Sequence, residues 1–176
     1  MRLNRVYLGD CLRVMQRIED KSIDMVLCDL PYGTTACKWD VIIPFEPLWE
    51  QYKRVIKENG AIVLFGSQPF SSLLVLSNIS MFKYEWVWDK VNRPTGHLNV
   101  KKQPMRIVES IFIFYKSQPN YNPQMFQGKP YKTLNGIGSD NYGSQKKTKL
   151  VSDGMRYPQN LIHIKSDERG TVGRLH

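Results

Sequence analysis

The chain has few of the groups that hold small folds together by covalent or metal bonds. Its three cysteines, Cys11, Cys28 and Cys37, form no CxxC pair, which argues against a disulfide framework or a zinc site and favours a reducing compartment. The three histidines share no metal-ligand spacing, so we predict no metal. No apolar run is long enough to span a bilayer. We therefore expect a cytoplasmic protein that does not associate with membranes.

Acidic residues are also scarce in the 176-residue chain, where 16 Asp and Glu stand against 25 Lys and Arg. The resulting formal net charge of +9 favours a polyanionic partner. Hydrophobic residues make up 41% of the sequence, which is typical of a globular domain and not of a disordered or coiled-coil chain. A chain of this length buries enough surface to fold without cross-links.

Short apolar runs alternate with helical periodicity over the first two-thirds of the chain, which predicts an α/β domain with a mostly parallel sheet. We expect strands at 6–8, 23–28 and 61–65, a hairpin of 84–88 and 109–115 on the sheet edge, and a last strand at 161–164. The strand at 23–28 is expected to be buried at the centre of the sheet. Helices are expected after Asp10, which can cap the first, over 44–58 and over 69–78. Lys53, Arg54 and Lys57 are expected on a solvated helix face.

Four consecutive residues, Asp29-Leu30-Pro31-Tyr32, follow the strand expected at 23–28. They fall at the carboxyl end of a parallel strand, where ligands of such sheets bind. Because Pro31 restricts Leu30 to an extended backbone, the Leu30 carbonyl is held beside the Asp29 carboxylate. Two fixed acceptors next to the Tyr32 ring form a receptor for a planar group with an exocyclic NH₂, such as a nucleobase. A simple strand-ending turn is the alternative interpretation.

This segment, followed by Gly33, resembles the catalytic motif of amino-group DNA methyltransferases, whose usual form is Asp-Pro-Pro-Tyr. Leu30 departs from that form, but the resemblance assigns the position a backbone carbonyl role, which leucine supplies equally. The resemblance implies a Rossmann-like S-adenosylmethionine-dependent methyltransferase fold in which Asp29, Leu30, Pro31 and Tyr32 are catalytic. It implies methyl transfer to the N6 amine of a flipped adenine in double-stranded DNA, with the N4 amine of cytosine as the runner-up.

The resemblance extends to segments expected at the cofactor. The segment 7–11 looks like the one whose acidic residue lies near the cofactor adenosine, which implies cofactor roles for Asp10 and Cys11. The same reading adds Asp29, Pro31 and, through a likeness to the family's His-Pro-Thr-Gln-Lys-Pro segment, His176. In the permuted class of the family the glycine-rich cofactor loop lies near the carboxyl terminus, and the chain stops before it. We therefore expect a fold that is incomplete at the C-terminus.

Residues 117–157 are rich in Gly, Pro, Asn, Gln and Lys and show little apolar periodicity, which predicts a long functional loop. Lysines follow phosphates, whereas Asn, Gln and Arg can read base edges; a solvated loop is the alternative. The candidate DNA contacts are Lys129, Lys132, Lys146, Lys147, Lys149 and Arg156, with Arg93, Lys101 and Lys102 in the preceding hairpin loop.

These assignments divide the chain into three segments. We expect a catalytic domain with the target-base site at 1–116, a target-recognition region at 117–157, and a return to the catalytic domain at 158–176. A non-catalytic DNA-binding fragment of such an enzyme is the alternative from another functional class. The family leaves open a cognate restriction endonuclease as a partner, and the sequence does not determine the oligomeric state.

Overall fold

The computed structural model describes residues 1–135 and 148–165. The chain divides into two compact units, one of Met1–Asn120 with Asn160–His176 and one of Tyr121–Gln159. Over the described residues, every helix is too short or too polar to cross a membrane.

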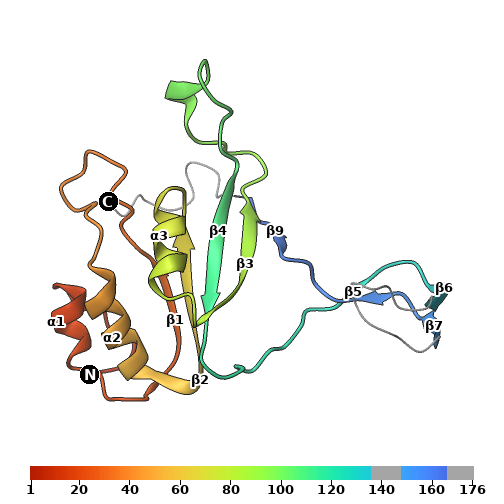
Figure 1. Cartoon of the computed structure of the whole chain (residues 1–176), viewed down its shortest axis with the longest axis horizontal. Coiled ribbons are helices and arrows are strands. Elements are labelled where there is room, and N and C mark those ends of the chain that lie inside the picture. The colour runs from red at the N-terminus through yellow and green to blue at the C-terminus, as the bar shows by residue number, and fades with distance from the viewer. Residues whose placement is uncertain (136–147, 166–176) are drawn as a thin grey trace. The chain divides into compact units, whose positions relative to one another are not determined.

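A five-stranded sheet lies at the centre of the first unit (Figure 1). Its strands follow the order β1-β2-β4-β3-β9, in which β1 and β2, and β3 and β9, are parallel. Strand β4 pairs antiparallel with both of its neighbours, so the sheet is mixed and not mostly parallel as predicted. The strands are β1 (Ile23–Asp29), β2 (Ile56–Gly66), β3 (Phe82–Asp89), β4 (Val108–Phe114) and β9 (Leu161–His163). The predicted hairpin forms, but it lies inside the sheet and not on its edge, because β9 covers the outer side of β3.

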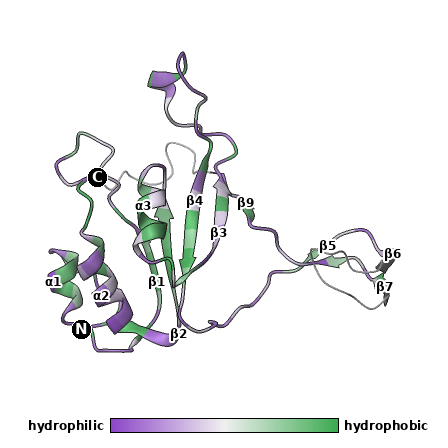
Figure 2. Ribbon diagram, in the orientation of Figure 1, coloured by the Kyte–Doolittle hydropathy of each residue, from purple (hydrophilic) through white to green (hydrophobic). Residues whose placement is uncertain are grey.

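Helices pack on this sheet through apolar stripes. They are α1 (Cys11–Met15), α2 (Phe45–Val55) and α3 (Phe70–Ser77), with a 3-10 turn η1 at His97–Asn99. Helix α2 buries Leu48, Trp49, Tyr52 and Val55, as the periodicity predicts. Leu48, Trp49 and Tyr52 join Ile62 and Leu64 of β2 and Phe112 and Phe114 of β4 in one core. Figure 2 shows the apolar colour concentrated along β1, β2 and β4.

The structure corrects two predictions near the N-terminus. Residues 6–8 form no strand, and the side chains of Val6 and Leu8 are fully exposed. Strand β1, predicted to be buried at the centre of the sheet, pairs with β2 alone among the described strands, and Met25 and Leu27 are more than half exposed. The apolar pattern of a strand identifies its own conformation but not its neighbours, so it could not show that only one described strand pairs with β1.

Helix α2 is shorter than predicted and ends in a cluster around Arg54. The helix stops at Val55 because Ile56 is already extended and pairs with Ile23 of β1. The Arg54 guanidinium donates to the backbone carbonyls of Met15 at 2.7 Å and Ile18 at 2.8 Å. It also pairs with Asp20, so this side chain is structural and not solvated as predicted. Arg54 thus satisfies carbonyls at the end of α1.

Replacing Arg54 by methionine keeps much of the aliphatic stem and removes these hydrogen bonds. We expect the Arg54→Met change to lower the free energy of unfolding by about 2–3 kcal/mol, since bonds to a charged donor are lost from partly buried carbonyls. Urea unfolding measures this change. The matched control is Lys53→Met, at an exposed neighbouring position, for which a change below about 0.5 kcal/mol is expected. Equal effects of the two substitutions would contradict the structural role of Arg54.

The second unit contains strands where the sequence predicted a loop. Strand β5 (Phe126–Gln127) pairs with β8 (Met155–Arg156), and β6 (Tyr131–Asn135) pairs with β7 (Thr148–Ser152), both antiparallel. Arg156 lies 4.5 Å from the Tyr131 ring centroid and donates to the Lys129 carbonyl at 2.7 Å. These strands are held by cross-strand contacts, which apolar periodicity does not reveal.

Candidate active site

A cleft of about 350 Å³ opens at the carboxyl end of β1. Its volume falls in the range of small-molecule sites. The lining residues come from the end of β1 and the loop that follows it: Asp29, Leu30, Pro31, Tyr32, Thr34, Thr35, Trp39 and Asp40. The four residues that the sequence singled out thus lie around one cavity, together with Trp39 and Asp40.

The cleft contains hydrogen-bond acceptors that have no protein donor. One carboxylate oxygen of Asp29, Oδ1, accepts the Tyr32 hydroxyl at 2.5 Å. Within residues 1–135 and 148–165, no group donates to the other oxygen of Asp29 or to the Leu30 carbonyl. The Leu30 side chain is only 6% exposed and packs in the core, which fixes the backbone at this position. Two acceptors on consecutive residues are therefore available to a ligand.

The Tyr32 ring is held against the core on one side. It stacks on Phe70 of α3, with ring centroids 5.0 Å apart and an interplanar angle of 27°. Burial, followed by the hydrogen bond to Asp29, raises the pKa of the Tyr32 phenol far above its ordinary value. Tyr32 is therefore neutral at physiological pH, and its hydroxyl serves as a donor to Asp29. Sequence reasoning did not identify Phe70, because an apolar helix residue carries no sign of such a contact.

Asp40 organises the loop that follows the motif. Its carboxylate accepts the backbone N–H groups of Gly33 at 2.8 Å, Thr34 at 2.9 Å and Thr35 at 2.7 Å. The Thr35 hydroxyl, followed by these N–H groups, lowers the pKa of Asp40 to about 2. The Asp40 side chain is itself buried. Asp40 follows Thr34-Thr35 by five residues. This spacing was the only sequence signal for its role, since short acidic side chains often accept hydrogen bonds from nearby backbone N–H groups.

Of the residues expected at the cofactor, Asp29 and Pro31 line the cleft, whereas two others lie outside it. Asp10 caps α1 by accepting the Arg13 N–H at 3.2 Å, as predicted, and Cys11 is the first residue of that helix. Neither Asp10 nor Cys11 is among the residues that line the cleft. His176 lies outside the described residues.

The candidate DNA contacts fall on both units. Lys101 and Lys102 are exposed and Arg93 is half-buried in the segment between β3 and β4. Lys129 and Lys132 are exposed in the second unit, whereas Arg156 is engaged by Tyr131 and the Lys129 carbonyl. Lys149 belongs to β7, and Lys146 and Lys147 lie outside the described residues.

Comparison with known proteins identifies the fold. No protein-family model matches the chain. The Type II methyltransferase M1.MboII of Moraxella bovis is 23% identical over 129 residues, which cover 67% of this chain and 48% of that protein. The structure of PvuII DNA methyltransferase, described as cytosine-N4-specific, matches with a TM-score of 0.56 and 14% identity, covering 94% of this chain and 58% of the other. The chain has a Rossmann-like DNA methyltransferase fold.

A second solved structure supports the same fold. The complex of M1.HpyAVI with SAM matches with a TM-score of 0.51 and 17% identity, over 91% of this chain and 66% of the other. The predicted fold class and the resemblance to amino-group DNA methyltransferases are thereby confirmed. The methyltransferase-like chain spans about half the length of M1.MboII.

Proposed function

We propose that this chain carries the target-base site of an S-adenosylmethionine-dependent DNA methyltransferase that acts in the cytoplasm on the N6 amine of adenine. The observation that carries the proposal is the pair of acceptors at the end of β1. The Asp29 carboxylate and the Leu30 carbonyl line the same 350 Å³ cleft as the Tyr32 ring. An exocyclic amine has two hydrogens, and a flat heterocycle needs a stacking surface, so the site matches both requirements.

These residues can favour attack by the amine through positioning and charge. The lone pair of the exocyclic nitrogen is delocalised into the base ring. Hydrogen bonds to Asp29 and to the Leu30 carbonyl hold both amine hydrogens, so the nitrogen can become pyramidal and turn its lone pair toward the methyl donor. Positive charge would develop on the nitrogen as the new N–C bond formed and the donor's S–C bond broke, and one amine proton would then leave along the hydrogen bond to Asp29. The negative charge of Asp29 stabilises that positive charge.

A base inside a duplex cannot reach this cleft, so the proposal requires the target base to be flipped out of the helix. Tyr32 supplies a stacking surface for the flipped base. Since Phe70 supports the Tyr32 ring, that surface is already held in place before the base arrives. We assign DNA phosphate contacts to the exposed Lys101, Lys102 and Lys129, among the basic residues predicted above.

The methyl donor implied by the fold is S-adenosylmethionine, which supplies an activated methyl group when bound. We assign its binding to Asp10 and Cys11 at the start of α1 and to Pro31 in the cleft. Asp10 uses one carboxylate oxygen to cap α1, and the described residues offer no donor to the other. An exposed acceptor of this kind fits a ligand that carries hydroxyl groups, such as a ribose.

The target base is determined by digestion and mass analysis of DNA treated with the protein and methyl-labelled S-adenosylmethionine. We expect N6-methyladenine. The N4 amine of cytosine presents the same two hydrogens to Asp29 and Leu30, so N4-methylcytosine would support the second candidate. A non-catalytic DNA-binding fragment would bind DNA with a steep salt dependence and transfer no label. That outcome would overturn the enzymatic proposal.

Replacing Tyr32 separates its two roles. We expect Tyr32→Ala to weaken binding of DNA with a mismatched, easily flipped target base by about 1–3 kcal/mol, because a stacking surface is lost. Tyr32→Phe keeps that surface and removes only the hydroxyl that bonds to Asp29, so binding should change little. Fluorescence anisotropy with labelled duplexes measures both. Undiminished binding by Tyr32→Ala would remove Tyr32 from base capture.

A further inference from the structure

A second cavity of about 450 Å³ lies at the opposite end of β1 and β2 from the Asp29 cleft. It is lined near the first residues of β2, by Ile56, Lys57 and Glu58, and by Lys21, which precedes β1. Since a strand advances about 3.3 Å per residue, the seven residues of β1 place the two cavities on the order of 20 Å apart. One small ligand cannot occupy both.

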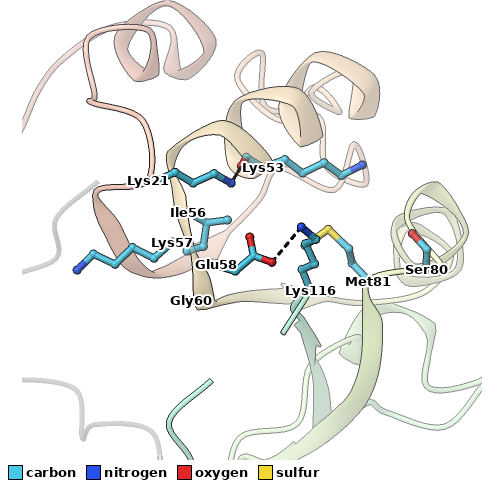
Figure 3. A pocket seen from close by; sticks show the side chains of 9 residues that line it. All are labelled: Lys21, Lys53, Ile56, Lys57, Glu58, Gly60, Ser80, Met81 and Lys116. Carbon is cyan, nitrogen blue, oxygen red and sulfur yellow. Dashed lines mark hydrogen bonds and ion pairs between the residues drawn. The ribbon is translucent and has the colours of Figure 1, made fainter. Parts of the chain in front are cut away.

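The rim of this cavity is strongly cationic. Four lysines from separate segments, Lys21, Lys53, Lys57 and Lys116, line it together with a single carboxylate, Glu58 (Figure 3). The ion pair of Lys116 and Glu58, at 2.9 Å, holds the pKa of Glu58 below its ordinary value. Glu58 is therefore ionised and offsets one lysine.

Two of these lysines have no carboxylate of their own. Lys57 pairs with Asp24 at 2.6 Å and points away from the cavity (Figure 3). Lys21 donates to the Lys53 carbonyl at 3.0 Å, so its ammonium is held at the rim by a neutral group. Among the described residues, no ion pair involves Lys21 or Lys53. The rim thus offers positive charge that the protein does not neutralise.

The floor of the cavity is apolar. Ile56 is 5% exposed and Met81 is 9% exposed, and both line the cavity. Gly60 completes the floor with no side chain, and a Cβ there would approach Ile56 Cγ1 to 2.7 Å. A substituent at this position would therefore push Ile56 and change the floor. Because little of Ile56 and Met81 is exposed, the methylene stems of the rim lysines supply much of the apolar lining.

We propose that this cavity binds a small organic anion, a carboxylate or phosphate joined to an apolar group. The anionic head would lie at the rim near Lys21 and Lys53, and the apolar group would cover Ile56 and Met81. Both contacts contribute, because exposed charge pairs are weak in water, whereas covering the lysine stems together with the exposed parts of Ile56 and Met81 adds roughly 25 cal/mol per Å² of apolar surface. The volume suits a small molecule. This site is independent of methyl transfer.

Calorimetric titration of the full chain tests the proposal with octanoate and octyl phosphate as probes. We expect at least one to bind, and inorganic phosphate and 1-octanol, which each lack one half of the ligand, to bind at least tenfold more weakly. The two probes distinguish a carboxylate from a phosphate ligand. Equal binding of 1-octanol and both anions would overturn the proposal, because it would reduce the cavity to a hydrophobic patch.

Substitutions locate the binding. Lys21→Gln and Lys53→Gln should each weaken binding of the anion at least fivefold. Lys38 is exposed and lies outside this cavity, so Lys38→Gln should leave the affinity unchanged. Thermal unfolding followed by circular dichroism confirms that each variant is folded, and Lys53 provides the test if Lys21→Gln does not fold. Unchanged affinity in the folded variants, or displacement of octanoate by a short DNA duplex, would overturn the assignment to a small anion.

Discussion

An Asp29→Ala variant should lose methyl transfer by about 10³-fold while it retains its fold and its affinity for DNA. The substitution removes the charged half of the acceptor pair and leaves the Leu30 carbonyl in place. It also removes the acceptor of the Tyr32 hydroxyl. Asp29→Asn keeps one neutral acceptor, so its rate of methyl transfer should lie between the rates of Asp29→Ala and the wild type. Single-turnover transfer of labelled methyl groups to a duplex measures the step.

The control for this prediction lies on the same strand. Asp24 is exposed near the start of β1 and pairs with Lys57, far along the strand from the cleft. Asp24→Ala should therefore leave transfer unchanged. If Asp29→Ala transferred methyl groups at the wild-type rate, the carboxylate would have no part in the chemistry and the proposed function would fail.

Asp40→Asn should reduce transfer by about 100-fold, although Asp40 is expected to position the loop and not to react. The Asp40 carboxylate accepts the backbone N–H groups of Gly33, Thr34 and Thr35 through both of its oxygens. The asparagine amide has only one oxygen, so its NH₂ group would face at least one of these N–H donors without forming a hydrogen bond. The loop that lines the cleft would then move. Because the acceptors on Asp29 and Leu30 stay in place, the loss should appear mainly in binding of the target base. Asp24→Asn, also acidic to amide, should have no effect.

The same loop should show a defined pH dependence. The pKa of Asp40 is lowered to about 2 from an ordinary value of 3.8. A lowered pKa means that the contribution of Asp40 to stability is complete above about pH 4 and is lost as the pH falls through 2. The amide resonances of Gly33 and Thr34 should therefore be unchanged from pH 7 to pH 4 and should shift below pH 3. In Asp40→Asn this transition should be absent; its persistence would show that another group titrates.

The sequence predicted those elements whose pattern is local. The apolar stripe of Leu48, Tyr52 and Val55 identified α2, and the run ending at Asp29 identified β1 and its motif. Asp10 was correctly predicted to cap α1. These features depend on residues a few positions apart, so helix and strand periodicity contain enough information to find them.

What the sequence did not reveal depends on contacts between distant segments. Arg54 was assigned to a solvated face because its neighbours are lysines, but its partners, Met15 and Ile18, lie far away along the chain. The strands of residues 121–159 are short and polar, so their pairing leaves no periodic signal. The role of Asp40 is defined by the backbone that folds around its carboxylate, so its position in the sequence did not reveal that role.

The second edge of β1, with which no described strand pairs, affects how this chain should be purified. Among the described strands only β2 pairs with β1, so the seven residues of β1, with exposed Met25 and Leu27, can pair along their second edge with an extended peptide such as an incompletely folded copy. Yield and homogeneity should therefore depend on protein concentration and on the rate of refolding more than on the intrinsic stability of the fold. Slow refolding at low protein concentration should limit this association. Light scattering during concentration measures it.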